Sequence, residues 1–346
     1  MDELILFYPT GHQGHFQRGH PERPERVEVI WNALQRAEWW GQVQQVDPVE
    51  VPETILKAVH TPAYLNLLEL SCRRGGHLDA DTYTTPQSWD LAHKSAGGAI
   101  AVAEAVWKQG ARGGAARQGL ALCRPPGHHA MRGQGMGFCL LNNIALAAEY
   151  LLKNLGAKKL AIIDLDLHHG NGTQDVFWKR KDVFYFSTHQ SPFYPGSGWL
   201  EETGEGEGQG FTANFPLPPG AGDMAFQTVM DALILPLLDR YMPEMLLVSY
   251  GFDPHWLDPL GQLLLTADGY ARLLSRLAAW SDAHCQGRLA IILEGGYDLE
   301  AAEACTLAVT NAMLGLEWSD PLGPAPYQES EGWRGMVRRA KEVWST

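Results

Sequence analysis

The chain has 346 residues, of which 45% are hydrophobic and 19% are charged, so it can bury a large core, and this composition argues against disorder. Its formal net charge of −13 argues against a nucleic-acid backbone or an anionic membrane as the main partner. The same charge is compatible with a cationic substrate or product.

The cysteines and the N-terminus indicate a reducing compartment. The five cysteines are scattered and form no C-x-x-C pair, which argues against a disulfide framework and against a Cys-rich zinc module. The opening "MDELILFYPT" places acidic residues before a short apolar run, unlike a signal peptide. No stretch approaches the roughly 18 apolar residues of a membrane span. We therefore predict a soluble, cytoplasmic protein.

Short apolar strands alternate with longer amphipathic helices along the chain. The predicted strands are residues 4–8, 120–123, 160–167, 183–187, 245–250 and 289–294. The predicted helices are residues 24–40, 88–110, 142–156, 224–241, 266–284 and 299–314. Strands that are apolar on both faces and alternate with helices are typical of a parallel sheet covered on both sides. Because no linker divides the chain, we predict one α/β domain, residues 1–346, with a central, mostly parallel sheet flanked by helices on both faces.

Polar residues follow the predicted strands at the sheet edge where open α/β sheets bind ligands. "LALC" leads into "RPPGHHA", "LAIIDLD" into "LHHGNG", "MLLVSY" into "GFDPHW", and "LAIILE" into "GGYD". If these ends converge, one pocket receives His128, His129, Asp164, Asp166, His168, Asp253 and Tyr297.

The stretch "AIIDLDLHHGNG" (161–172) suggests a metal site. Alternation with a period of two would place Asp164, Asp166 and His168 on one face of a strand. Together with another carboxylate such as Asp253, Asp166 and His168 form a three-ligand set like that of catalytic zinc; iron(II), cobalt and manganese stay open on donor type. The alternative is that Asp164 and Asp166 cap a following helix. Polar residues at several strand ends favour the site.

The tandem His128–His129 offers a general base and a second imidazole beside that metal. Each needs a partner on its other ring nitrogen, and Asp164 and Asn171 are available. His169 and His255 have no role that the sequence assigns. The remaining histidines considered are interpreted as structural: His12, His15, His60, His77, His93 and His284. Tyr297 follows two glycines, which allow its phenol to enter the pocket; the alternative is a capped turn.

Seven motifs, in this order, resemble class II histone deacetylases, specifically the bacterial histone deacetylase-like amidohydrolases of the arginase–deacetylase superfamily. They cover nearly the whole chain: "HPERPERV" (20–27), "CRPPGHHA" (123–130), "GMGFCLLNN" (135–143), "DLDLHHGNGTQ" (164–174), "STHQSPFYPGSG" (187–198), "SYGFDPHWLDPLG" (249–261) and "LEGGYDL" (293–299). The resemblance implies a single α/β domain and zinc-dependent removal of acetyl groups from lysine Nε.

The resemblance also assigns catalytic roles. It implies that the zinc ligands are Asp166, His168 and Asp253. His129 would be the general base and then the acid, and His128 its electrostatic partner, hydrogen-bonded to Asp164. Asn171 falls behind His129, where class I members have Asp. Tyr297 would donate to the scissile carbonyl, and since members with His at this position are poor deacetylases, its presence favours activity.

Further roles follow from the same resemblance. The acyl-lysine channel would have Phe138 and Phe193 or Tyr194 as aromatic walls, with Gly137 and Leu260 also in contact with substrate. A structural potassium site would use backbone carbonyls of Asp164, Asp166 and His168 and the hydroxyl of Ser187. Arg26 is expected near an internal product cavity, and Asp79 or Asp81 as the rim carboxylate that binds the substrate backbone.

The substrate would be an acetylated lysine peptide or protein, or an acetylated small amine. An acetylpolyamine amidohydrolase is the first alternative. Polyamine-selective eukaryotic relatives carry glutamate in "DPEG", whereas this chain has "DPLG" with Leu260, which favours acetyl-lysine. A non-catalytic acyl-lysine binding module and an arginase-like di-metal enzyme are disfavoured by the complete set of ligands, tandem His and Tyr297. Such proteins often form oligomers, and the sequence carries no interface signal that decides this.

Overall fold

The central sheet is built from short strands that all run in parallel and that, except for the exposed edge strand β2, are buried. In the computed structural model, which describes residues 4–110 and 118–345, eight strands are ordered β2-β1-β5-β10-β9-β6-β7-β8. They are β1 (Ile5–Phe7), β2 (Gln44–Gln45), β5 (Gly119–Ala121), β6 (Leu160–Asp164), β7 (Val183–Gln190), β8 (Thr212–Leu217), β9 (Leu246–Tyr250) and β10 (Leu289–Leu293). A separate antiparallel pair is formed by β3 (Gly76–His77) and β4 (Tyr83–Thr84).

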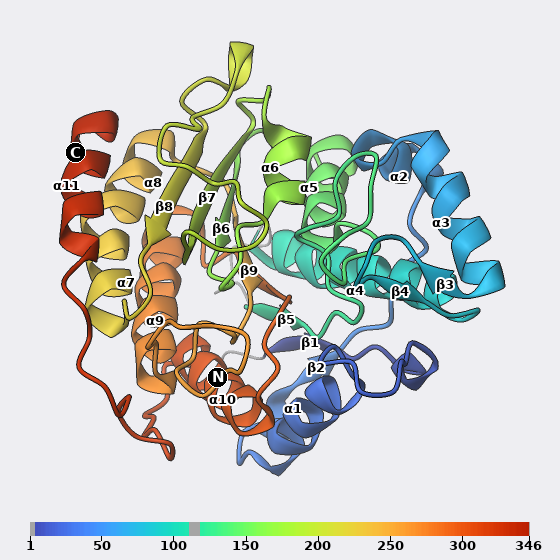
Figure 1. Ribbon diagram of the computed structural model, residues 1–346, viewed down its shortest axis with the longest axis horizontal. Coiled ribbons are helices and arrows are strands. Elements are labelled where there is room, and N and C mark those ends of the chain that lie inside the picture. The colour runs from blue at the N-terminus through green and yellow to red at the C-terminus, as the bar shows by residue number, and fades with distance from the viewer. Residues whose placement is uncertain (1–3, 111–117, 346) are drawn as a thin grey trace.

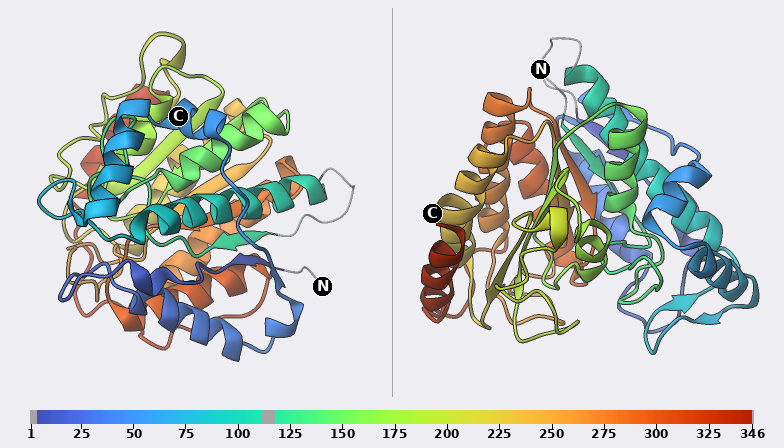
Figure 2. Two further views of the ribbon diagram at one scale, coloured as in Figure 1. Left: turned by 90° about the vertical axis from the view of Figure 1, so that its right-hand side faces the viewer. Right: turned by 90° about the horizontal axis from the view of Figure 1, so that it is seen from above.

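Helices cover both faces of this sheet (Figure 1). One layer contains α1 (Glu25–Arg36), α7 (Asp223–Val229), α8 (Leu235–Tyr241), α9 (Ala267–His284), α10 (Leu299–Met313) and α11 (Trp333–Trp344). The other contains α2 (Glu53–Val59), α3 (Pro62–Arg74), α4 (Ser88–Gly110), α5 (Asn143–Asn154) and α6 (Asn171–Phe177). Short 3-10 turns lie at residues His12–Gly14, Trp40–Gln42 and Gly206–Gly208, and a π turn, Met230–Ile234, joins α7 to α8. Seen from above, the sheet separates the two layers (Figure 2).

The two layers bury two apolar cores, one on each face of the sheet. On the N-terminal strand, Leu4 and Leu6 pack into the core beneath α1 and α10, whereas Ile5 and Phe7 pack into the core beneath α4. Successive side chains of a strand point to opposite faces, so a strand between two helix layers is apolar at nearly every position. This explains the continuous apolar runs in the sequence.

The structure confirms the predicted fold class, a single α/β domain with a parallel sheet between helix layers. Every predicted strand and helix is present, and residues 224–241 form α7, the π turn and α8 in succession. The outer limits of the predicted domain, residues 1 and 346, lie outside the described residues. The sequence prediction missed the strands β2, β3, β4 and β8 and the helices α2, α3, α6 and α11. The strand β8 is at the edge of the sheet and contains Pro216 and Asn214, residues that weaken a strand pattern.

One predicted strand is too long. Residues 160–167 were expected to be extended, but β6 ends at Asp164. Beyond it, the carboxylate of Asp164 accepts a hydrogen bond from the backbone N–H of Asp166, and Asp166 accepts one from that of His168. These side-chain acceptors offer the backbone an alternative to the sheet. The face of a strand therefore does not explain how Asp166 and His168 are placed.

The cysteines are all free and buried: Cys72, Cys123, Cys139, Cys285 and Cys305. In the described part of the chain, no helix combines the length and the apolar character that crossing a bilayer requires.

Sheet order determines where the functional residues meet. The strands β5, β10, β9 and β6 are consecutive neighbours in the sheet. Because all of them are parallel, their carboxyl ends lie at the same edge. The four polar segments that the sequence placed after these strands are therefore adjacent in space.

Candidate active site

Four loops at this edge supply the side chains of the candidate site. The loop after β5 carries His128 and His129, and the loop after β6 carries Asp166 and His168. Asp253 follows β9 by three residues, and Tyr297 follows β10 by four. His128 and Tyr297 are 169 positions apart in the sequence, and the sheet brings the segments that carry them together.

Asp166, His168 and Asp253 form one compact group. One donor atom from each lies within 4.8 Å of the others. His168 Nδ1 is 3.1 Å from Asp166 Oδ1 and 3.2 Å from Asp253 Oδ2. Both carboxylates are fully buried, and the His168 side chain is 12% exposed. The helix-capping alternative is wrong, since the N-cap of α6 is Gly170 and no side chain caps it.

This group fits a divalent metal ion. Two buried carboxylates that converge on one imidazole nitrogen repel each other unless a cation lies between them. Among the described residues, Asp253 Oδ2 has no hydrogen-bond donor. At Gly295, a Cβ would lie 2.5 Å from Asp253 Oδ2 and 2.6 Å from Asp166 Oδ2, so the backbone approaches the group closely, and the Gly295 N–H donates to Asp166 Oδ2 at 2.8 Å. Two oxygen donors and one nitrogen donor suit zinc and other first-row metals.

His128 is positioned by a buried carboxylate. Its Nδ1 donates to Asp164 Oδ2 at 3.1 Å, and the same oxygen accepts from the hydroxyl of Tyr185. Burial lowers the pKa of His128, and the carboxylates of Asp166 and Asp164 outweigh this and raise it to about 10. A cation held by Asp166 would offset part of that effect and leave Asp164 as the main support for a positive charge on His128.

His129 has a neutral partner instead. Its Nδ1 lies 2.7 Å from Asn171 Oδ1, and because an amide oxygen only accepts, Nδ1 carries the proton. The other ring nitrogen, Nε2, is then free to accept one. Burial and the neighbouring His128 and His168 lower the pKa of His129 well below 6.5. At neutral pH, His129 is therefore an unprotonated base.

Tyr297 lies in the lining of the same cavity as His129 and His168. The guanidinium of Arg26 stacks on its ring at 4.9 Å from the centroid, and the ring of Phe138 meets it edge-on at 5.7 Å. Burial raises the pKa of Tyr297 well above 10, so the phenol keeps its proton and can donate a hydrogen bond. The cap of the following helix is Asp298, not Tyr297.

The cavity has a polar floor and aromatic walls. Phe193 stacks on His168 with ring centroids 5.5 Å apart, and Tyr194 meets His129 edge-on at 5.2 Å. The volume is about 400 Å³, within the range of small-molecule sites. The lining consists of Asp79, Ala80, Asp81, His129, Gly137, Phe138, His168, Phe193, Tyr194, Leu260 and Tyr297. A slim, largely apolar chain fits this cavity.

Two other predicted residues, Ser187 and Arg26, are buried outside the lining of the cavity. Ser187 is buried opposite Asp164 in the pairing of β6 with β7, and its hydroxyl lies 2.9 Å from His189 Nδ1. Arg26 is fully buried, donates to the carbonyls of Glu294 and Gly296, and pairs with Glu22.

The two histidines without an assigned role have structural partners. His169 bridges Ser197 and Gln174, and His255 accepts the backbone N–H of Leu257. Neither residue lines the cavity.

Sequence reasoning missed three buried residues that hold the site in place. Thr82 accepts the backbone N–H of Phe138, Asp258 accepts those of Leu260 and Tyr297, and Glu294 accepts those of Gly127 and His128. Asp258 and Glu294 belong to the motifs "DPLG" and "LEGGYD", so the sequence did mark both positions as close to site residues. No spacing rule indicates which distant backbone groups a buried carboxylate will contact.

Known proteins resemble this chain over most of its length. Residues 20–313 match the histone deacetylase domain. The chain is 40% identical to a probable deacetylase of Archaeoglobus fulgidus over 91% of this chain and 87% of that protein. It is 36% identical to a histone deacetylase-like amidohydrolase of Pseudomonas aeruginosa over 93% and 87%, respectively.

A solved structure agrees with the sequence relatives. The crystal structure of the HDA15 HD domain matches with a TM-score of 0.88 and 31% identity, covering 99% of this chain and 95% of that chain.

Proposed function

Because the chain belongs to the histone deacetylase family, whose members are deacetylases and amidohydrolases, we propose that it hydrolyses Nε-acetyl-lysine and releases acetate. The observation that carries this proposal is the shared cavity. A neutral histidine, a protonated tyrosine and a member of the candidate metal-ligand group all line one aromatic-walled space of about 400 Å³. Metal-assisted amide hydrolysis uses a base, an oxyanion donor and a metal ion within reach of one carbonyl.

The proposed zinc ligands are Asp166, His168 and Asp253. When bound, zinc would polarise the acetyl carbonyl and lower the pKa of the attacking water toward roughly 7. Three protein ligands are the number typical of catalytic zinc sites, which use a further position for water or substrate.

The proposed base is His129. Its Nδ1 carries the proton that Asn171 accepts, so Nε2 would be the nitrogen that accepts a proton from water. His129 takes one proton from water as the water oxygen bonds to the acetyl carbon. The imidazolium then gives a proton to the leaving lysine nitrogen as the carbon–nitrogen bond breaks. The positive charge on His128 beside it, supported by Asp164, keeps His129 unprotonated before the reaction and favours the return of the proton.

The proposed oxyanion donor is Tyr297. As water adds to the carbonyl, negative charge develops on the acetyl oxygen, and the phenol donates a hydrogen bond to it. The Arg26 guanidinium on its ring and the Asp258 carboxylate on its backbone N–H hold this residue in the cavity wall.

The acetyl-lysine side chain would lie between Phe138 and Phe193 or Tyr194, in contact with Gly137 and Leu260. Asp79 or Asp81, which also line the cavity, would bind the substrate backbone. Leu260 supports a lysine substrate, since an apolar side chain in the lining cannot pair with the distal ammonium of a polyamine.

We also propose a structural potassium ion on the carbonyls of Asp164, Asp166 and His168 and the hydroxyl of Ser187. The buried pairing of Asp164 with Ser187 supports it.

The test is to measure initial rates on an acetyl-lysine peptide, N-acetylputrescine and N-acetylspermidine. Each is assayed with the metal chelated and again after zinc is restored. We expect peptide turnover that disappears on chelation and returns with zinc. The variant Leu260→Glu serves as a comparison, because a carboxylate there would favour the acetylated polyamines.

Other outcomes would change the proposal in defined ways. A large preference of the wild type for acetylpolyamines would keep the reaction and overturn the substrate. No turnover of any of the three by the zinc-loaded protein would contradict deacetylation of these amines. Full activity after chelation would contradict the role of zinc.

A further inference from the structure

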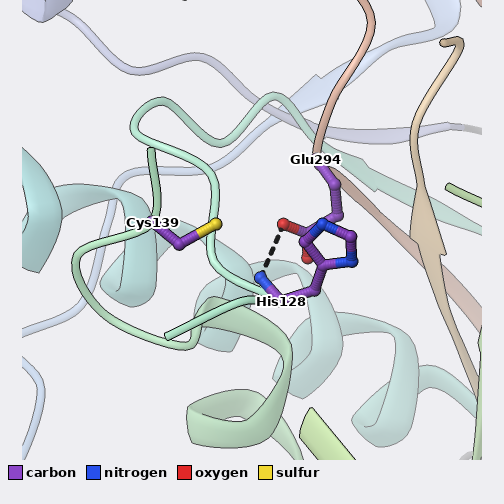
Figure 3. Close-up of side chains that lie close together, drawn as sticks. All are labelled: His128, Cys139 and Glu294. Atoms are coloured by element: carbon purple, nitrogen blue, oxygen red, sulfur yellow. Dashed lines mark hydrogen bonds between the residues drawn. The ribbon is translucent and has the colours of Figure 1, made fainter. Parts of the chain in front are cut away.

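A second group of metal-type side chains lies beside the candidate site. Figure 3 shows His128, Cys139 and Glu294, which come from different segments and point toward one another. One donor atom from each lies within 4.8 Å of the others, and all three residues are buried. Imidazole, thiol and carboxylate are the donors of a zinc site, so the group could be taken for a second metal centre.

The contacts of these three residues argue against a metal there. The Glu294 carboxylate is already occupied: Oε2 accepts the backbone N–H groups of Gly127 at 2.7 Å and His128 at 3.0 Å, and Oε1 accepts the hydroxyl of Ser249 at 3.1 Å. The Cys139 thiol donates to the carbonyl of Gly137 at 3.4 Å. A thiol must lose its proton to bind a metal, and burial raises the pKa of Cys139 well above 9. The His128 ring is directed to Asp164.

The hydrogen bonds of Glu294 give it a different role. The two N–H groups that it accepts belong to the turn that carries His128 and His129, the residues of the proposed acid–base pair. A fully buried carboxylate that accepts several N–H groups fixes the backbone that donates them, because each lost contact would leave a buried donor unpaired. Glu294 thereby ties the loop after β5 to the end of β10.

The segment that starts at Glu294 reaches the other components of the site as well. The next residue, Gly295, donates to Asp166 Oδ2 at 2.8 Å, and Tyr297 lies three residues after Glu294. The carbonyl of Glu294 accepts a hydrogen bond from Arg26 at 2.6 Å. One tetrapeptide therefore contacts the histidine loop and a candidate metal ligand, and carries the proposed oxyanion donor.

We propose that Glu294 is a positioning residue for the deacetylation reaction, which holds the His128–His129 turn in register with Asp166 and Tyr297 through its hydrogen bonds to the Gly127 and His128 amides. This inference rests on the proposed function for its kinetic effect. The contact itself can be tested without any turnover.

Three substitutions separate positioning from other effects. Glu294→Ala removes the acceptor. Glu294→Gln keeps one oxygen for the two backbone N–H groups, and its amide can donate to Ser249. Glu149→Ala is the matched control, because Glu149 is also fully buried but lies on α5 and pairs with Lys153 and Arg180. If Glu294→Ala does not fold, Glu294→Met replaces it, since methionine keeps the length of the side chain and lacks a carboxylate.

The first measurement is hydrogen–deuterium exchange on the zinc-loaded proteins. In Glu294→Ala, we expect faster exchange in the peptide covering residues 124–130 and unchanged exchange in β6. In Glu294→Gln, the same peptide should stay close to wild type. Wild-type exchange at residues 124–130 in the folded Ala or Met variant would overturn the proposal, whether or not the protein deacetylates anything.

The second measurement is the separate determination of kcat and KM on an acetyl-lysine peptide. Misplacing a catalytic group by about 1 Å costs on the order of 10²-fold in rate, so Glu294→Ala should lose about 10²-fold in kcat with KM changed less than about threefold. Glu294→Gln should recover most of kcat, and Glu149→Ala should keep it. An equal loss of kcat in Glu294→Gln and Glu294→Ala would overturn positioning by hydrogen bonds.

Measuring the metal content tests the alternative that His128, Cys139 and Glu294 bind a second metal ion. We expect the same zinc content in wild type, Glu294→Ala and Cys139→Ala. A second zinc in the wild type that is lost in both variants would show a metal site and overturn the proposal. If wild type has no deacetylase activity while the exchange result holds, the proposed function fails and the structural contact stands.

Discussion

The two histidines of the tandem differ in pKa because their surroundings differ: the carboxylates of Asp166 and Asp164 raise the pKa of His128, whereas burial and the neighbouring His128 and His168 lower that of His129. His128 donates to the carboxylate of Asp164, whereas His129 donates to the neutral amide of Asn171. The pKa of His128 is raised to about 10, and that of His129 is lowered well below 6.5. Environments that push two neighbouring pKa values apart separate the roles of charged partner and base.

The pH dependence of the proposed activity follows from this difference. A base works in its neutral form, so activity is lost as the pH falls through its pKa. Because that pKa lies below its usual value, we expect kcat/KM to stay level as the pH falls from 8 to about 6.5. In Asn171→Asp, a carboxylate beside the ring favours the protonated form, so the acidic limb should move to higher pH. A pH–rate profile of both proteins checks this; an acidic limb that does not move would contradict the assignment of His129.

The phenol of Tyr297 can be removed without removing its ring. Tyr297→Phe keeps the contacts with Arg26 and Phe138 and loses one oxyanion donor, a change that costs about 10² to 10³ in rate. We expect kcat to fall by that factor while the melting temperature stays within a few degrees. Tyr327→Phe is the control, because Tyr327 is 73% exposed. Comparable turnover in the Tyr297 variant would rule out the proposed role.

Contacts between loops determine the shape of the cavity. Asp258 accepts the backbone N–H of Leu260 at 2.9 Å and that of Tyr297 at 2.6 Å, so it links the loop after β9 to the loop after β10. Phe138 has a φ of +70°, a left-handed conformation that costs a non-glycine residue roughly 1–3 kcal/mol. Its N–H donates to the hydroxyl of Thr82, next to the β3–β4 pair, at 3.1 Å. An aromatic wall thus depends on a distant loop.

Thr82→Val tests that dependence. It keeps the shape of the side chain and leaves the Phe138 N–H without its acceptor, at a cost of about 1–3 kcal/mol. We expect lower stability and a KM for acetyl-lysine peptide that is raised several-fold. The value of kcat should change much less, because Phe138 would contact the lysine side chain and not the atoms that react. Thr82→Ser keeps the hydroxyl and should behave as wild type. Steady-state kinetics and urea unfolding check this; an unchanged KM would show that the wall does not depend on Thr82.

At the scale of the whole molecule, the fold brings two buried carboxylates together at one edge of the sheet. Asp166 and Asp253 are fully buried, and their mutual repulsion opposes folding when no cation is bound. Metal binding and folding stability should therefore be linked.

Zinc should raise the melting temperature. At a free concentration a hundred times its dissociation constant, a ligand that binds only the folded state adds about 2.7 kcal/mol of stability. We expect chelation to lower the midpoint of thermal unfolding and added zinc to restore it. His168→Ala should show a much smaller response. An identical midpoint with and without zinc in the wild type would contradict the ligand assignment.

Acid should destabilise the protein through a buried ion cluster. Glu22 pairs with Arg124 at 2.7 Å and Arg26 at 3.2 Å, joining α1 and its preceding loop to the loop after β5. Burial raises the pKa of Glu22, and Arg124, His15 and Arg26 together outweigh it and lower the pKa from 4.5 to about 2. A pKa that is lower in the folded state adds stability above the unfolded value, and this stability is lost as the pH falls through the folded one.

Urea unfolding at several pH values measures the effect. We expect the contribution of Glu22 to be complete above about pH 5 and to disappear between about pH 4.5 and 2. Glu22→Gln leaves buried arginine charge unpaired, which costs about 3–5 kcal/mol, and its stability should change less over this acidic range. An identical slope in both proteins would contradict the assignment to Glu22.

The sequence by itself determined the architecture and the identity of the candidate site residues. Short runs that are apolar at nearly every position alternate with amphipathic helices, and this pattern specifies a parallel sheet covered on both faces. Each strand and helix can be identified from its own local residues. The residues after these runs, such as Asp166 and Tyr297, could be named for the same reason: the carboxyl ends of parallel strands share an edge. The pattern failed where it was weak or interrupted, as at the edge strand β8 and beyond Asp164.

Only the tertiary structure decided which partners those residues have. The neighbours of β5 are β1 and β10, and no local pattern encodes that order. It brings the Glu294 carboxylate against the amides of the histidine turn, and Asp258 against the Tyr297 amide. Burial and charge then act on His128 and His129 from segments that are distant in the chain. Local sequence specifies the elements, whereas hydrogen-bond partners and pKa values arise from contacts that form only when the chain is folded.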